Sequence, residues 1–547
     1  MNKNSFEVLI IGSGATGGVA AMTFAEKGIK VLMIEAGPNL NIEKALGSEP
    51  ENTLNRIKGI INGQHNIQAQ HPGFWKANPS LYMNEKDNPY QTPLNKPFIW
   101  TQGRQVGGRS LTWGGITLRF AENDFNPSTI NQLTNRWPIN YSDLNEHYSY
   151  LERTFKIHGN KDKLTQLPDG DYSIKPLPLT EVEEEFRDTL KRKLNYPFIQ
   201  SRGFGPNDSD KEWPRSSSPG SSLKNALATN NVKILSNHIA ERIVMNKSQT
   251  SAEHIIVVDK ITNARKKIDA KLIVLCASTI QSVRLLLNSK ENMQTNGLID
   301  PSNSLGCYLM DHISTCKFFN IERRSTISNN DRNNPLSGAG SFFIPFGTEL
   351  PYPNKINFTG GYGIWGGIDR FKLPSWLNKL TNKKIGFLIS HGEVLPCISN
   401  KIALSEKLDK WGIPQPYIDF EWKDNERRMI SHMNYTMNQI IKETGGEIID
   451  FQKIIKVPFA PNLISKILAL RKESPPPGYY IHEVGGARMG DKEENSVVDK
   501  WNRLWRCKNV LVVDGACWPT SSWQSPTLTM MAITRRACLN AIKNLSD

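Results

Sequence analysis

The first part of the chain alternates between short apolar runs and a stretch of small residues. Residues 6–12, with the sequence FEVLIIG, form a nearly continuous apolar run, which is typical of a buried parallel strand. Small and apolar side chains continue to about residue 27 and predict a helix, and residues 30–35 predict the next strand. Together these segments predict a β-α-β unit.

Similar apolar segments recur along the rest of the chain. We expect strands at residues 232–235, 255–259, 272–275 and 510–513, and helices at residues 141–155, 279–288, 425–443 and 526–542. Residues 40–100 are rich in Asn, Pro and Gln with little periodicity, so we expect long loops that wrap a ligand. Residues 203–222 predict a surface loop, and the Pro-Pro-Pro-Gly run at 475–478 predicts a boundary.

A glycine-rich turn follows the first predicted strand. Gly12, Gly14 and Gly17 match the spacing G-x-G-x-x-G, and Glu35 ends the next predicted strand. In dinucleotide-binding folds these glycines permit a tight turn, the approach of a pyrophosphate to the backbone, and close helix packing, while the acidic residue accepts hydrogen bonds from ribose. The helix N-terminus offers free N–H groups to phosphate. We therefore expect cofactor contacts from Gly12, Gly14, Ala15, Thr16, Gly17 and Glu35.

The length of the chain changes this picture. A chain of 547 residues exceeds what one hydrophobic core usually supports, so we expect at least two domains. Segments that suit the same nucleotide-binding domain recur at residues 101–120, 272–288 and 510–530. A ligand contacted from the whole length of the chain favours embedded FAD over the NAD of a compact nicotinamide dehydrogenase, which remains the alternative.

Charge and cysteine content exclude several classes of protein. The net charge is +14, but the basic residues are dispersed in short clusters, so we expect a solvated basic surface and no nucleic-acid partner. The seven cysteines form no C-x-x-C pair, so we expect no metal site, and their scattered spacing suits free thiols in a reducing compartment. We find no signal peptide and no transmembrane run, and expect a cytoplasmic protein.

Several motifs resemble the glucose–methanol–choline (GMC) oxidoreductase family, particularly its sugar-oxidising, pyranose oxidase-like branch. They are GRQVGGRS at residues 103–110, WGG at 113–115, HEVGGARMG at 482–490, VVDGA at 512–516 and SPTLT at 525–529. The resemblance covers nearly the whole chain in the family's order. It implies further contacts to FAD from Arg104, Gly107, Gly108, Ser110, Ala240, Asp514, Gly515 and Thr527.

The resemblance also bears on how the flavin is held. Some family members attach FAD covalently through a histidine in the segment that corresponds to residues 107–113. This chain has Thr112 at the matching place, and a threonine cannot form that bond. We therefore expect non-covalent FAD.

The resemblance implies a catalytic histidine at His482. Oxidation of an alcohol requires a base for the hydroxyl proton, and histidine suits that task because its pKa lies near neutrality. The family usually places histidine or asparagine opposite this base, and here the register places Ser525, which is shorter and cannot be a cation. We interpret His312 as a hydrogen-bonding residue at a domain junction, and Arg119 as a candidate for lining a sugar site.

The expected fold is α/β: a Rossmann-like FAD-binding domain and a second, α+β substrate domain built on a mostly antiparallel sheet. We assign residues 1–150, 217–312 and 480–547 to the first domain and residues 151–216 and 313–479 to the second.

The expected function is FAD-dependent removal of hydride from the CH–OH group of an alcohol, polyol or sugar to flavin N5, with an unknown electron acceptor. An oxygen-using oxidase, a flavin-dependent lyase or decarboxylase, and a flavin-binding protein without catalysis remain alternatives.

Overall fold

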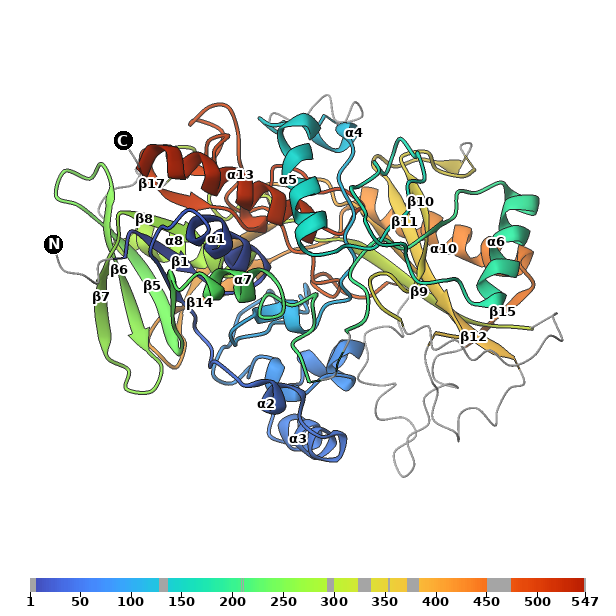
Figure 1. Cartoon of the computed structure of the whole chain (residues 1–547), viewed down its shortest axis with the longest axis horizontal. Helices are drawn as coiled ribbons and strands as arrows, with labels where there is room; N and C mark the ends of the chain where they lie inside the picture. The colour runs from blue at the N-terminus through green and yellow to red at the C-terminus, as the bar shows by residue number, and fades with distance from the viewer. Residues whose placement is uncertain are drawn as a thin grey trace.

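The computed structural model describes residues 6–126, 136–207, 209, 211–292, 300–322, 336–352, 355–370, 383–449 and 474–545. Two large sheets lie at opposite ends of an elongated molecule (Figure 1). Segments from the beginning, middle and end of the chain meet between them. Among the described residues, no helix is long and apolar enough to cross a membrane.

The first sheet is mainly parallel and is assembled from distant parts of the chain. Its strand order is β16-β17-β8-β1-β2-β4, and only the β16–β17 pair is antiparallel. The strands are β1 (Val8–Ile11), β2 (Val31–Ile34), β4 (Val232–Leu235), β8 (Leu272–Leu275), β16 (Arg503–Leu504) and β17 (Cys507–Val512). Strands β1, β2 and β8 are buried throughout, as their continuous apolar sequences predicted.

Helices cover this sheet. They are α1 (Ala15–Ala25), α7 (Ser222–Ala228), α8 (Thr279–Asn292) and α13 (Thr527–Leu545), and α5 (Tyr141–Thr154) packs against α13. Helix α1 contacts both α7 and α13. A Cβ atom at Gly18 would lie 2.2 Å from Ser222 Oγ, so the small residues of α1 allow α7 to approach closely. The predicted β-α-β unit and the helices expected near 141–155, 279–288 and 526–542 are confirmed.

Two smaller antiparallel units flank the parallel sheet. A three-stranded sheet contains β5 (His238–Met245), β6 (Ala252–Asp259) and β7 (Arg265–Asp269), and a hairpin joins β13 (Lys401–Leu408) to β14 (Pro414–Asp419). The hairpin packs on α8. Strand β5 was not predicted from the sequence, although its residues alternate between buried and half-buried.

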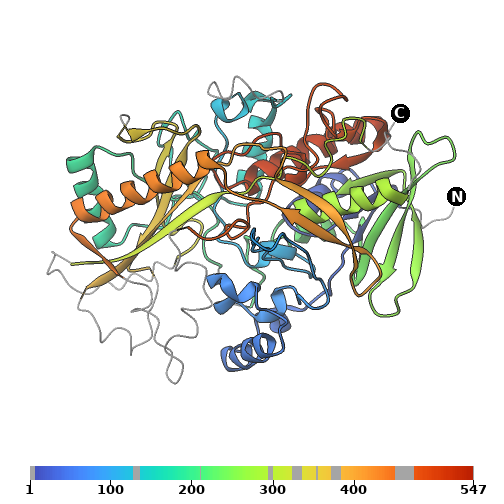
Figure 2. The same cartoon turned by 180° about the vertical axis from the view of Figure 1, so that it is seen from behind.

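The second large sheet is antiparallel in all the pairings that the structure describes. Its order is β15-β9-β12-β11-β10-β3. The strands are β3 (Ile199–Gln200), β9 (Ile313–Ile321), β10 (Phe342–Gly347), β11 (Tyr362–Ile368), β12 (Lys384–Gly392) and β15 (Gly446–Ile449). Helix α10 (Asp424–Glu443) crosses one face of this sheet (Figure 2), and α6 (Glu181–Leu194) packs beside it. The fold is therefore α/β with a second α+β unit, as predicted.

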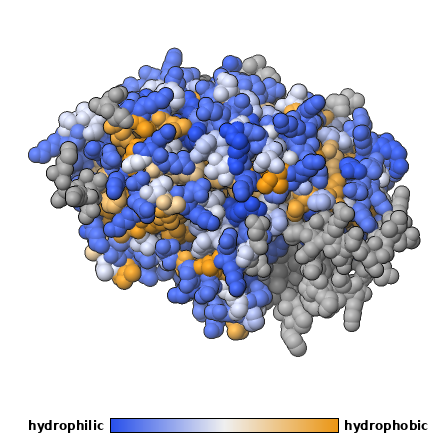
Figure 3. Space-filling model, viewed as in Figure 1, coloured by the Kyte–Doolittle hydropathy of each residue, from blue (hydrophilic) through white to orange (hydrophobic). Residues whose placement is uncertain are grey.

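The expectation of long loops at residues 40–100 is only partly confirmed. The segment contains α2 (Ile42–Leu46) and α3 (Glu49–Ile61), followed by short 3₁₀ helices. Helix α3 escaped prediction because its apolar residues mostly face solvent: Leu54, Ile57 and Ile61 are exposed. Figure 3 shows the visible face as mainly hydrophilic, with separate small apolar patches.

The division into two domains stays a proposal. All strands of the parallel sheet fall within residues 1–150, 217–312 and 480–547, and all strands of the large antiparallel sheet fall within 151–216 and 313–479. The hairpin β13–β14 belongs to the second range by sequence but packs on α8 of the first. Helix α5 also crosses the proposed boundary at residue 150.

Candidate active site

A cavity of about 540 Å³ lies between the two large sheets. Its walls come from both sheets and from loops throughout the chain. All the site residues predicted from the sequence line it except Gly17, Gly107 and Arg119; those that do are Gly12, Gly14, Ala15, Thr16, Glu35, Arg104, Gly108, Ser110, Ala240, His482, Asp514, Gly515, Ser525 and Thr527. Residues from the beginning, the middle and the end of the chain therefore face the same cavity.

The turn after β1 has the backbone that its glycines predicted. Gly12 has φ of +99°, and a Cβ there would lie 2.3 Å from the carbonyl oxygen of Cys276. A Cβ at Gly17 would lie 2.0 Å from the Gly12 oxygen, so Gly17 serves helix packing and does not face the cavity. At Gly14 the nearest atom to an added Cβ is Gly107 O at 4.0 Å, which leaves open space on the cavity side.

Glu35 is held at the end of β2 by nearby donors. Its carboxylate accepts hydrogen bonds from the Ser13 hydroxyl at 2.6 Å and from the Gly37 backbone N–H at 2.8 Å. Burial raises the pKa of this carboxyl group. The carboxylate lines the cavity, so it also has lone pairs available to a ligand.

The segment that contains residues 103–110 packs against this turn. Gly107 N donates to Ser13 Oγ at 3.0 Å, and a Cβ at Gly107 would lie 2.8 Å from Pro219 Cδ, so Gly107 supports the loop from outside the cavity. Ser110 Oγ donates to Gly107 O at 2.6 Å and accepts from Ser218 N at 2.8 Å. Its hydroxyl therefore fixes the backbone rather than pointing freely at a ligand.

Arg104 lines the cavity near Glu35. Its guanidinium carbon lies 5.4 Å from the centre of the Trp411 ring. Burial lowers the pKa of Arg104 to about 10. Its buried Nη1 has no hydrogen-bond partner among the described residues. A buried guanidinium nitrogen without a partner fits a site that receives an acceptor from a ligand.

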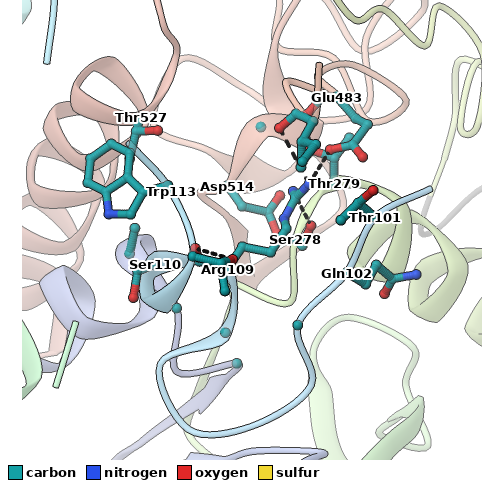
Figure 4. Close-up of a pocket in the computed structure, with 18 of the residues that line it drawn as sticks. Thr101, Gln102, Arg109, Ser110, Trp113, Ser278, Thr279, Glu483, Asp514 and Thr527 are labelled. Atoms are coloured by element: carbon teal, nitrogen blue, oxygen red, sulfur yellow. Dashed lines mark hydrogen bonds and ion pairs between the residues drawn. The ribbon is translucent and has the colours of Figure 1, made fainter. Parts of the chain in front are cut away.

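Arg109 connects three loops at the middle of the cavity, and sequence reasoning missed it as an organising residue. Its guanidinium donates to Glu483 at 2.7 Å and to Ser278 Oγ at 2.9 Å (Figure 4). Asp514 lies close by, where it accepts from Ser282 Oγ at 2.5 Å and from Ala516 N at 3.0 Å. Burial raises the pKa of Asp514 to about 6.

His482 lies at the other end of the cavity, together with Ser525. The His482 backbone N–H donates to Asp311 Oδ1 at 2.9 Å, and its ring Nδ1 lies 2.8 Å from Nδ1 of His312. Burial lowers the pKa of His482 well below the usual value, so its imidazole is neutral. The structure thus brings the predicted base to the same cavity as the glycine turn.

The antiparallel sheet supplies uncharged side chains to this end of the cavity. They are Ser314 from β9, Trp365 from β11 and Ile389 from β12. Trp365 Nε1 donates to the Tyr480 hydroxyl at 2.9 Å. Sequence reasoning missed Trp365 and Tyr480, since nothing in their neighbouring residues distinguishes them from core aromatics.

Arg119 is the sequence candidate that the structure removes from the site. It does not line the cavity. Its guanidinium is nearly fully buried and forms an ion pair with Glu152 at 2.6 Å, and it also donates to Tyr141 at 2.8 Å. Arg119 therefore holds helix α5 and does not contribute to the lining of this cavity.

Comparison with known proteins gives matches along nearly the whole chain. Family models described as GMC oxidoreductase match residues 6–314 and 396–534. The 2-methyl-1,2-propanediol dehydrogenase of Mycolicibacterium austroafricanum is 26% identical, over 99% of this chain and 96% of its own. The fructose dehydrogenase large subunit of Gluconobacter japonicus is 23% identical over 99% and 98%, and the pyranose 2-oxidase of Lyophyllum shimeji is 22% identical over 100% and 93%.

A solved structure has a similar fold over nearly its whole length. Pyridoxine 4-oxidase from Mesorbium loti superposes with a TM-score of 0.61 at 16% identity, over 98% of this chain and 99% of that one. Since the family models match most of the chain, including the parallel sheet and all the motifs that pointed to the family, the chain belongs to the GMC oxidoreductase family.

Proposed function

We propose that this protein is an FAD-dependent oxidoreductase that oxidises the CH–OH group of an alcohol, polyol or sugar, with His482 as the base. The observation that carries the proposal is that a neutral imidazole faces the same cavity as the dinucleotide turn. Neither feature alone specifies the reaction. Together they would place a proton acceptor and a nucleotide site in one cavity.

The residues of the cavity fit FAD. Open space beside Gly14 suits a pyrophosphate against the backbone, and the unpartnered nitrogen of Arg104 suits a ligand acceptor at the nucleotide end. Ala240, Asp514 and Thr527 are proposed to contact the remaining parts of the cofactor. When bound, FAD would supply the acceptor for the hydride that leaves the alcohol carbon.

His482 performs the proton chemistry in this proposal. A neutral imidazole can accept the hydroxyl proton of the substrate, whereas an imidazolium cannot. Ser525 would hold the substrate hydroxyl or its oxygen by one hydrogen bond. Because serine carries no charge, it cannot stabilise an alkoxide as a cationic residue would.

The substrate is proposed to be uncharged. Ser314, Trp365 and Ile389 come from the antiparallel sheet and carry no charge, while Arg109 at mid-cavity is already paired with Glu483. An anionic sugar acid in contact with Ser314, Trp365 and Ile389 would therefore meet hydroxyl, aromatic and aliphatic surface and no cation from the antiparallel sheet. Neutral polyols and sugars fit better, because their apolar ring or chain faces can stack on Trp365.

We also propose that FAD is bound without a covalent link and that the protein works in a reducing compartment such as the cytoplasm. Thr112 lines the cavity, and its hydroxyl donates to the backbone oxygen of Arg109, so no histidine is available there for a covalent bond. All seven cysteines lie within the described residues, and none of them forms a disulfide there, as suits a reducing compartment.

The test is anaerobic mixing of the purified flavoprotein with a panel of alcohols, polyols and neutral sugars. We expect at least one of them to bleach the flavin absorption band, and His482→Ala to retain its flavin but lose that reaction by about 10²-fold or more. Equal bleaching in the wild type and in His482→Ala would refute the assignment of the base.

The same preparation separates the alternatives. Rapid recovery of the band on admitting air would identify an oxidase, and slow recovery a dehydrogenase. Consumption of a substrate without any bleaching in the absence of oxygen would instead identify a lyase or decarboxylase.

A further inference from the structure

We propose that His312 is a positioning residue that fixes the His482 ring with its proton on Nδ1 and its lone pair on Nε2. The inference rests on the proposed role of His482 as the base and goes beyond it, because it states which nitrogen of the ring receives the proton. It also assigns a task to a second buried histidine.

The proton on His312 is placed by a backbone carbonyl. His312 Nε2 contacts the carbonyl oxygen of Ser522. A carbonyl oxygen can only accept, so Nε2 of His312 must carry a hydrogen. His312 is buried, and burial lowers its pKa to about 4, so the ring is neutral near pH 7 and its other nitrogen holds a lone pair.

That lone pair decides the state of His482. The two Nδ1 atoms lie 2.8 Å apart, and the rings meet edge to face with centres 4.8 Å apart. Since His312 Nδ1 can only accept, His482 Nδ1 must donate. In a neutral imidazole the remaining nitrogen, Nε2 of His482, is then unprotonated.

The backbone around His482 is fixed by the residue next to His312. Asp311 accepts from the backbone N–H of His482 and from that of Gly478, both at 2.9 Å. Ile481, between them, has φ of 65°, which is unfavourable for a β-branched residue and must be held by its surroundings. Asp311 thus fixes the backbone of His482, and His312 fixes its ring.

The arrangement accommodates the proton that the reaction delivers. When His482 Nε2 takes the hydroxyl proton, Nδ1–H continues to donate to His312, so no hydrogen bond has to reverse. Burial, and after it His312, His391 and Arg109, lowers the pKa of His482, so the ring is neutral before it takes the proton. Tyr480 and the buried carboxyl groups of Asp311 and Glu483 complete the polar surroundings.

Nitrogen-15 NMR of histidine-labelled, FAD-loaded protein tests the inference without any substrate. The chain has ten histidines, and His482→Asn identifies the signals of His482 by their loss. We expect His482 near pH 7 to be neutral with the proton on Nδ1. A signal pair with the proton on Nε2 would overturn the proposal.

Two variants of His312 extend the test. His312→Phe keeps the ring shape but removes both nitrogens, so we expect a shift of the His482 proton toward Nε2. His312→Gln can accept from His482 and donate to the Ser522 carbonyl, and should restore the Nδ1-protonated form. His254→Gln, on β6 outside the cavity, is the matched control and should change nothing.

Kinetics with the same variants separate this inference from the proposed function. We expect His312→Phe to lower the rate constant of flavin reduction about 10²-fold, with little change in substrate affinity and an altered pH profile, and His312→Gln to recover much of the loss. If His482→Ala abolishes reduction while His312→Phe leaves both rate and tautomer unchanged, the role of His312 is wrong and the function stands. If neither variant affects reduction, the proposed function itself fails.

Discussion

At the scale of single residues, the site departs from its family at two places where one side chain changes the chemistry. Thr112 stands where some relatives carry a flavin-linking histidine, and Ser525 stands where histidine or asparagine is usual. Both residues line the cavity. Each gives a prediction that can be checked on the isolated protein.

Thr112 predicts that the flavin can be removed. We expect acid precipitation of the purified protein to leave the yellow colour in the supernatant and a colourless pellet, because no side chain at this position can form the covalent bond. Refolding or dialysis with added FAD should then restore the bound spectrum. Colour that remains in the washed pellet would contradict this prediction.

Ser525 predicts a moderate effect on the rate. A neutral hydrogen bond contributes about 0.5–1.5 kcal/mol, so Ser525→Ala should slow flavin reduction by about 2-fold to 13-fold. The pH profile should keep its shape, because serine does not titrate in the working range. Stopped-flow reduction at saturating substrate measures the effect, and a loss as large as that of His482→Ala would mean that Ser525 does more than hold one hydroxyl.

The residue scale also marks the limit of sequence reasoning. Gly12, Gly14 and Glu35 could be assigned in advance because their spacing follows from the backbone of a single β-α-β unit. Trp365 and Tyr480 could not, because their contact joins β11 to a loop far along the chain. The pairing of His482 with His312 depends on the same kind of tertiary contact.

At the scale of elements, the turn at residues 478–482 is held in place from outside. Asp311, just before β9, accepts hydrogen bonds from both ends of the turn. The sequence indicated a boundary at 475–478 from its prolines. It could not indicate which residue would hold the turn, since Asp311 lies far away in sequence.

Asp311→Asn tests this contact. An amide offers one acceptor oxygen, and its NH₂ would face a backbone N–H, so we expect unfolding to become easier by about 1–3 kcal/mol and reduction of the flavin to slow. Chemical denaturation measures the first effect. Asp424→Asn at the exposed start of α10 is the control and should leave stability unchanged. An unaltered denaturation curve for Asp311→Asn would show that the turn at residues 478–482 does not depend on its hydrogen bonds to Asp311.

Elements with strong local signals were predicted well, and those set by distant contacts were not. Helix α10 begins within one residue of the prediction because its apolar positions recur with helical spacing over five turns. Strand β17 ends one residue earlier than predicted. Helix α3 was missed because the exposure of its apolar side chains could not be anticipated from an Asn-rich segment.

At the scale of the whole molecule, buried carboxyl groups control how stability depends on pH. Burial raises the pKa of Asp311 to about 7 and that of Glu393 to about 8. A raised carboxyl pKa means that the folded state holds a proton that the unfolded state has lost. Their stabilising contribution is therefore lost as the pH rises through these values.

We therefore expect the protein to become less stable between about pH 6.5 and pH 8. Burial lowers the pKa of His71 and of His312 to about 4, so both rings are neutral in the folded state while they are protonated in the unfolded state below about pH 6.5. These two histidines therefore make the protein more stable as the pH rises from about 4 to 6.5, which opposes the effect of the carboxyl groups in that range. The midpoint of thermal unfolding, followed by release of flavin fluorescence, measures the change. Glu393→Gln keeps the acceptor for Gly361 N and should flatten the decline. A midpoint that rises toward pH 8 would contradict the prediction.

The cavity between the sheets has a consequence for biosynthesis. Its walls include residues 12–16 of the early turn and also residues 482, 514, 525 and 527, and α13 packs against α1. During translation, the turn after β1 is synthesised long before residues 482, 514, 525 and 527, which form other walls of the cavity. Flavin loading is then confined to chains whose final helix has been released, so nascent and prematurely terminated polypeptides would be colourless and open to proteases.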